Sequence, residues 1–261
     1  MESTRTLIFG IFVLAGRTLT TAQVIALAKP LRIPATNVKS HLTRMVADGA
    51  LQRSGPVRHA VYWPSRSQSN VIEGINTRLD ETRSERWDRT WLILILQMPT
   101  NRGQRETLRA SLWFDGFRLF APNTFVRPAW PLDWTLRKAR QYLSTARGSC
   151  MRGEFVGTAG TAQARCIYEL DSLNSEALRI AEWIDTRRIP TAASKSVAFA
   201  MRLKVGGLVA RLVGHDPRLP AAIWGNRTGL RKLVRAFRKF ETRIAPPSQQ
   251  FLDDVIGMTR R

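Results

Sequence analysis

The sequence predicts an α+β protein built from consecutive parts that differ in their pattern of apolar residues. Over residues 1–66, apolar residues recur at helical spacing and lead into a Ser-Gly-Pro turn between two strand-like stretches. Over residues 87–172, apolar runs typical of strands alternate with amphipathic stretches typical of helices. Residues 173–261 have helical spacing alone, and residues 67–86 are a polar boundary followed by a short amphipathic linker helix.

The first predicted helix covers residues 6–16, TLIFGIFVLAG. This run resembles the apolar core of a signal peptide, but it is too short to span a bilayer, and the acidic Glu2 stands where a signal peptide is basic. Arg17 closes the run without a small-residue cleavage site. We therefore predict a buried helix, and no other stretch is apolar enough for a membrane span.

Two further helices follow in the first part. The second begins at Thr20, because Thr20 and Gln23 have the spacing of a capping box, and Pro30 ends or bends it. The third begins near Pro34 and stops at Gly49. Its predicted buried face consists of Val38, Leu42, Met45 and Val46.

A basic hairpin completes this part. Residues 50–53 and 57–63 have strand-like patterns around the turn at residues 54–56. Three helices followed by a hairpin are the layout of a winged helix-turn-helix, a DNA-binding domain. Residues 1–66 hold nine Lys and Arg against two acids, Glu2 and Asp48, which gives a formal charge of +7.

The outward face of the third helix is the main candidate site. A helix fits the major groove of DNA, where Asn pairs with adenine and Lys or Arg with guanine. The alternative is an ordinary solvated helix face, and the adjoining helix, hairpin and charge favour DNA. The candidate residues are Thr36, Asn37, Lys39, Ser40, Thr43 and Arg44 on the helix, and Arg53, Arg58 and His59 on the hairpin, where they would hold phosphates or enter the minor groove.

The middle part, residues 87–172, is predicted as a ferredoxin-like sandwich with the order β-α-β-β-α-β. Its predicted strands are residues 91–98, 117–120, 124–127 and 163–170, and its predicted helices are residues 102–114 and 134–146. Five tryptophans in this part could line a pocket for an aromatic ligand, but core packing is the favoured interpretation. They are Trp87, Trp91, Trp113, Trp130 and Trp134.

The last part, residues 173–261, is predicted to be all-helical. Its helices are expected near residues 175–187, 192–213, 227–244 and 247–257. Residues 227–239 contain six Lys and Arg and no acid, opposite an apolar face. We interpret this stretch as an amphipathic helix packed on its own domain, with its charge available to an anion such as DNA or an effector.

The formal net charge of +21 indicates a polyanionic partner, and nucleic acid is the first choice. The two cysteines, Cys150 and Cys166, form no metal-binding pattern with the three histidines, so no metal site is expected, and sparse cysteine fits the cytoplasm. No catalytic motif is present, and Asp115, Asp133 and Glu154 are isolated acids. The sequence therefore predicts a protein that is not an enzyme.

The sequence resembles one family, the PaaX-type repressors of phenylacetic acid degradation. Three stretches carry the resemblance, and they occur in the family's order along the chain. They are residues 38–49 (VKSHLTRMVADG), residues 87–91 (WDRTW) with Leu108-Arg109 and Gly116-Phe117, and residues 215–220 (HDPRLP).

The resemblance implies a winged helix, a middle domain like the Cas2 fold and a helical C-terminal domain. It also implies a homodimer that represses a catabolic operon from a palindromic operator. The implied releasing effector is an aryl-CoA thioester, typically phenylacetyl-CoA, bound at residues the resemblance does not specify, and no cofactor is implied.

Two alternatives remain. One is a nucleic-acid-binding protein, for DNA or RNA, that ignores sequence and acts through charge alone. The other is a Cas2-like metal-dependent nuclease. Such nucleases carry an Asp just after the first strand, and the matching residue is Gln97, whose amide binds a hard divalent metal less well than a carboxylate does.

Overall fold

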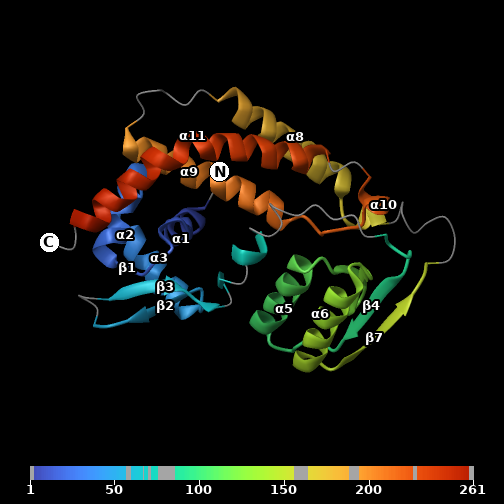
Figure 1. Ribbon diagram of the computed structural model, residues 1–261. Coiled ribbons are helices and arrows are strands. Elements are labelled where there is room, and N and C mark those ends of the chain that lie inside the picture. Colours follow the sequence, from blue (N-terminus) through green and yellow to red (C-terminus); the bar gives the residue numbers. More distant parts are fainter. Residues whose placement is uncertain are drawn as a thin grey trace. The chain divides into compact units, whose positions relative to one another are not determined.

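The computed structural model describes residues 3–56, 60–66, 68–69, 72–75, 86–155, 164–187, 194–225 and 228–258. The chain forms two compact units, each assembled from separated stretches (Figure 1). The first unit combines Met1–Asp80 with Arg179–Val213 and Lys232–Arg261. The second combines Glu81–Leu178 with Gly214–Arg231.

The N-terminal stretch of the first unit has the element order of a winged helix-turn-helix. The elements are α1 (Thr4–Ala15), β1 (Leu19–Thr20), α2 (Thr21–Ala28), the 3₁₀ turn η1 (Lys29–Leu31), α3 (Ala35–Ala47), β2 (Leu51–Ser54) and β3 (Val61–Pro64). The strands are antiparallel in the order β1-β3-β2. The predicted helices and hairpin are confirmed, but β1 was not predicted, because two residues carry no alternation.

Local chemistry sets the starts of α2 and α3. At α2 the capping box forms, since the Gln23 N–H donates to Thr20 Oγ1 at 3.2 Å and the Thr20 N–H donates to Gln23 Oε1 at 2.9 Å. Pro30 falls in η1, which ends α2 as expected. Pro34 occupies the N-cap of α3, one residue before the helix, in extended backbone.

The core of the first unit draws on distant parts of the chain. Ile8, Ile11 and Phe12 of α1 are fully buried. In the same cluster lie Phe199 and Leu203 of α9 (Lys195–Gly214), and Leu252 and Ile256 of α11 (Thr228–Met258). The fit is close at Gly10, where a Cβ atom would stand 2.9 Å from Leu203 Cδ2.

This packing corrects the expected domain organisation. The sequence predicts a separate helical domain over residues 173–261, whereas these residues divide between the two units. The physical reason is that the apolar faces of α9 and α11 are buried against the helices of the N-terminal stretch. The predicted linker at residues 67–86 lies mostly outside the described residues, and only residues 68–69, 72–75 and 86 of it are placed.

The second unit is centred on a ferredoxin-like sandwich, as predicted. Its elements are β4 (Trp91–Leu96), α5 (Arg102–Phe114), β5 (Arg118–Ala121), β6 (Thr124–Pro128), α6 (Leu132–Thr145) and β7 (Gly148–Gly153). The strands are antiparallel in the order β5-β6-β4-β7. Alternate residues Leu92, Leu94 and Leu96 of β4 face a core that includes Leu112 of α5 and Ala139 of α6.

The closing strand is not where the sequence predicts it. The prediction places it at residues 163–170, but residues 164–167 are helical and β7 pairs with β4 from Gly148 to Gly153. β7 lies at the sheet edge with most side chains exposed, so GSCMRG lacks the apolar alternation of a half-buried strand. Gly148 is required there, because a Cβ atom would collide with the carbonyl oxygen of Ile95.

The C-terminal helices differ from expectation at their ends. α8 spans Leu170–Thr186, and a short helix, α10 (Ala221–Trp224), precedes α11. The sequence predicts a break in α11 near residue 245, but the helix continues through Pro246 and Pro247. Buried Ile244 and Leu252 hold it on both sides of the prolines, which offsets the lost main-chain hydrogen bonds. No helix within the described residues is long and apolar enough to cross a membrane.

Candidate nucleic-acid interface

The structure brings the predicted helix residues onto one face of α3. Val38, Leu42 and Met45 are buried in the core of the first unit, as predicted. The opposite face is open to solvent. It carries Thr36, Asn37, Lys39, Thr43 and Arg44 as exposed side chains and Ser40 as a half-buried one.

Most polar groups on this face are available to a partner. Thr43 Oγ1 donates to the Lys39 carbonyl oxygen at 3.1 Å, so its hydroxyl proton is used within the helix. Asn37, Lys39 and Arg44 make no side-chain hydrogen bond or ion pair with another residue of the described part of the chain. An amide and two cations therefore face solvent on a helix that is fixed from behind by its apolar side.

An ion pair holds the end of α3. The Arg5 guanidinium on α1 binds the Asp48 carboxylate, 43 residues away, at the C-cap of α3. Asp48 Oδ1 also accepts from the Ala50 N–H at 3.2 Å, just before β2. The hydrogen bond from Arg5 is the main cause of the lowered pKa of Asp48; burial opposes it, and the Ala50 N–H lowers the pKa by a smaller amount. Sequence reasoning missed Arg5, because no local pattern marks so distant a partner.

The hairpin carries part of the predicted site. Arg53 on β2 is exposed and lies opposite Tyr62 of β3. Next to it, the Trp63 indole Nε1 donates to Gln52 Oε1 at 2.7 Å, which ties the two strands by their side chains. Arg58 and His59 lie outside the described residues, so the structure places only Arg53 of the three.

The basic stretch of α11 forms an amphipathic helix, as predicted. Leu233, Ala236 and Phe240 are buried, and the cations lie on the exposed side. Arg227 lies outside the described residues. The exposed cations are Arg231, Lys232, Arg235, Arg238, Lys239 and Arg243.

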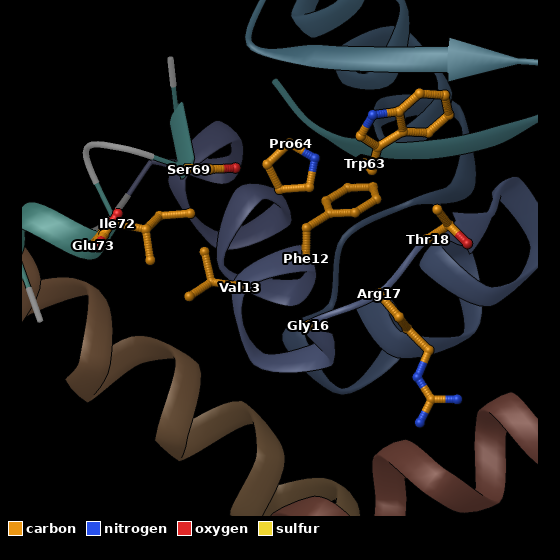
Figure 2. Close-up of a pocket in the computed structure, with 10 residues that line it drawn as sticks. All are labelled: Phe12, Val13, Gly16, Arg17, Thr18, Trp63, Pro64, Ser69, Ile72 and Glu73. Carbon is orange, nitrogen blue, oxygen red and sulfur yellow. The ribbon is translucent and has the colours of Figure 1, made fainter. Parts of the chain in front are cut away.

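A pocket of about 760 Å³ opens in the first unit (Figure 2). Residues of α1 and β3 line it together with Ser69, Ile72 and Glu73, and Phe12, Val13 and Ile72 make much of its wall apolar. Figure 2 shows the Phe12 ring next to Pro64, with the Arg17 guanidinium directed away from both. The remaining lining residues are Gly16, Thr18, Trp63, Ser69 and Glu73.

The tryptophans of the second unit are only partly core. Trp91 and Trp130 are buried, as the favoured interpretation requires. Trp113 is 37% exposed and lines a second cavity, so core packing is the wrong interpretation for this residue. Gln97 is exposed just after β4, and no cluster of metal-ligating side chains occurs in the part of the chain that the structure describes.

Comparison with known proteins identifies the middle of the chain. The family profile of the PaaX protein central Cas2-like domain matches residues 84–164. The fold resembles the solved structure of the uncharacterized protein Rv0674 from Mycobacterium tuberculosis, with a TM-score of 0.56, 22% identity, and coverage of 95% of this chain and 98% of that one. No curated protein sequence matches the chain. Residues 84–164 are therefore similar to the central Cas2-like domain of PaaX proteins, in the position that the sequence predicts for such a domain.

Proposed function

We propose that the protein is a sequence-specific DNA-binding transcriptional regulator whose helix α3 lies in the major groove. The observation that carries the proposal is the outward face of α3, where Asn37, Lys39 and Arg44 are unengaged by other described residues. The similarity of residues 84–164 to the central domain of PaaX proteins supports the same function. The absence of a catalytic motif in the sequence is consistent with a protein that is not an enzyme.

Each side chain has a defined role in this proposal. Asn37 pairs with adenine, and Lys39 or Arg44 pairs with guanine, because these are the donor and acceptor patterns that the major groove presents. Arg53 on β2 binds a backbone phosphate, which positions the helix without reading sequence. The sequence assigns the same role to Arg58 and His59, which lie outside the described residues.

The regulator is proposed to be a homodimer on a palindromic operator, because a two-fold protein matches two-fold DNA. It represses a catabolic operon and is released by an acyl-CoA such as phenylacetyl-CoA, as the family resemblance implies. The pocket lined by residues of α1 and β3 supports this proposal. A ligand bound there would contact both of these elements, which belong to the proposed DNA-binding stretch (Figure 2). Release requires that the effector bind the non-binding arrangement more tightly than the DNA-bound one.

A competition mobility-shift assay tests the DNA proposal. Wild type should hold a selected operator against excess random duplex, whereas Asn37→Ala and Arg44→Ala should each lose about tenfold or more in specific affinity. Arg140→Ala is the matched control, because Arg140 is an exposed cation on α6. Equal effects of Arg44→Ala and Arg140→Ala would contradict the assignment of α3.

A second candidate function is sequence-independent binding of nucleic acid through charge. The net charge of +21 and the exposed cations of α11 favour it. Such binding falls steeply as salt rises and does not distinguish competitor sequences. The competition assay therefore separates the two functions, because only a specific regulator keeps a preference when random DNA is in excess.

A further inference from the structure

The second unit contains a cavity of about 370 Å³ at the junction of α5, β5 and the start of α8. This volume lies within the range of small-molecule sites in proteins, about 300 to 1,000 Å³. The cavity is distinct from the pocket of Figure 2, which belongs to the first unit. Its lining residues are Trp113, Arg118, Leu119, Ile167, Tyr168, Glu169, Ser172, Leu173, Glu176 and His215.

The main feature of this cavity is a buried guanidinium. Arg118 is 9% exposed, and its guanidinium carbon lies 4.4 Å from the centre of the Trp113 ring and 5.1 Å from that of Tyr168. Aromatic faces attract such a cation and hold its plane in one orientation. Burial lowers the pKa of Arg118, which marks the cost of keeping a charge away from water.

Arg118 is only partly satisfied by the protein. Nη1 donates to the Trp113 carbonyl oxygen at 2.8 Å and to the Phe117 carbonyl oxygen at 3.2 Å. A guanidinium has five N–H donors, and those on Nε and Nη2 have no acceptor among the described residues. No described carboxylate lies within ion-pair distance of Arg118. An anion in the cavity would supply both the missing acceptors and the counter-charge.

The other polar residues restrict which anion fits. Glu169 and Glu176 line the same cavity, and Glu169 is close enough to raise the pKa of Arg118 against the effect of burial. Two carboxylates repel a polyanion such as a nucleotide or a CoA thioester. A ligand with one carboxylate and one ammonium satisfies both signs, because its carboxylate faces Arg118 and its ammonium faces the glutamates.

The remaining wall is aromatic and apolar. The Trp113 indole is 37% exposed, and the His215 ring packs edge-on against it at 4.6 Å. Leu119 lines the same cavity and is 54% exposed. Exposed apolar surface at a cavity wall favours a ligand with an apolar or aromatic group.

We propose that this cavity binds a zwitterionic amino acid with an apolar or aromatic side chain. Arg118 takes the α-carboxylate, Glu169 and Glu176 take the α-ammonium, and Trp113 contacts the side chain. The proposal does not rest on DNA binding, and it is tested without DNA.

Calorimetric titration of the full-length protein with L-tryptophan, L-phenylalanine and L-leucine tests the class of ligand. At least one of them should bind, whereas 3-phenylpropionate, which lacks the ammonium, and 2-phenylethylamine, which lacks the carboxylate, should bind at least about tenfold more weakly. Equal binding of 3-phenylpropionate would overturn the role of the glutamates. Failure of all three amino acids at millimolar concentration would overturn the proposal.

Variants then test the site with the amino acid that binds. Trp113→Leu and Glu176→Gln should each weaken binding about tenfold, and Arg118→Lys should weaken it further because a lysine does not reproduce the fork of donors. The matched controls are Trp183→Leu, an equally exposed tryptophan outside the cavity, and Glu106→Gln on α5. If Arg118→Lys does not fold, Trp113→Leu decides, and unchanged binding by Trp113→Leu would overturn the assigned site.

Discussion

Arg127 of β6 donates a hydrogen bond from Nη2 to the carbonyl oxygen of Arg218, 91 residues further along the chain, at 3.4 Å. The same nitrogen donates to the Trp130 carbonyl oxygen at 3.1 Å, and Nη1 donates to that of Asp115. Both guanidinium groups lie over the Trp134 ring, Arg127 at 4.5 Å and Arg218 at 5.2 Å. Residues 215–220, which carry part of the family resemblance, are therefore built into the Cas2-like unit.

Arg127→Met should destabilise the second unit by about 3 kcal/mol, because it leaves buried carbonyl groups without their donor. Arg127 is 1% exposed, so water cannot replace the lost donor. Urea unfolding followed by tryptophan fluorescence measures the change. Arg137→Met, an exposed arginine on α6, is the control and should change stability by no more than about 0.5 kcal/mol.

Gly116→Ala should be destabilising by about 2 kcal/mol or more. Gly116 has a φ of +81°, and a Cβ atom there would stand 2.6 Å from the Pro217 carbonyl oxygen and would also meet Arg127. Gly153→Ala is the control, because nothing lies within 4 Å of its Cβ position. Similar unfolding midpoints for the two variants would show that a Cβ atom at residue 116 fits beside residue 217, which contradicts the close contact.

Tyr168 should make stability fall at high pH. Its hydroxyl donates to the Gly116 carbonyl oxygen at 2.9 Å, and burial raises the pKa of Tyr168 to about 12. In the unfolded chain tyrosine ionises near pH 10, so the unfolded state loses this proton at a lower pH than the folded state does. Raising the pH above about 10 therefore favours the unfolded state. Tyr168 therefore contributes about 3 kcal/mol to the free energy of unfolding below about pH 10, and this contribution is lost by about pH 12.

The variant Tyr168→Phe isolates this effect. Phenylalanine does not ionise, so the unfolding free energy of the variant should fall less steeply than that of wild type between about pH 10 and pH 12. Denaturant titrations at several pH values give both slopes. Parallel curves for the two proteins would mean that Tyr168 ionises equally easily in the folded and unfolded states.

Leu252→Ala should weaken DNA binding although it lies far from α3 in sequence. Leu252 of α11 is 1% exposed and belongs to the same core as Val38 and Leu42 of α3. Its truncation should lower the free energy of unfolding by about 2 to 5 kcal/mol. Near the melting temperature of the protein, a smaller fraction of molecules is then folded and able to bind the operator. Val197→Ala, on an exposed part of α9, is the control. Unchanged stability in Leu252→Ala would contradict a shared core.

The sequence predicts best where one element carries its own signal. The capping box at Thr20 and the apolar spacing of Val38, Leu42 and Met45 place α2 and α3 within a residue or so. The outward face of α3 follows from the same spacing, because the buried positions fix the exposed ones. Most of the candidate interface was therefore predictable.

The sequence fails where structure depends on distant partners. β7 is an exposed edge strand without alternation, and its position follows from pairing with β4 rather than from its own residues. The split of the C-terminal helices between the two units depends on where Phe199 and Leu252 pack. The buried pair Arg127 and Arg218 resembles ordinary surface arginines in sequence, since only tertiary contacts reveal their burial.

Selection of bound sequences from a random duplex library at physiological salt distinguishes a sequence-specific regulator from a protein that binds through charge. A dimeric regulator should select a palindromic motif with half-sites about 10 bp apart, or a multiple of that spacing, and Asn37→Ala and Arg44→Ala should select a weaker or altered motif. No enriched motif, together with binding that disappears as salt rises, would contradict sequence-specific regulation and favour binding through charge alone.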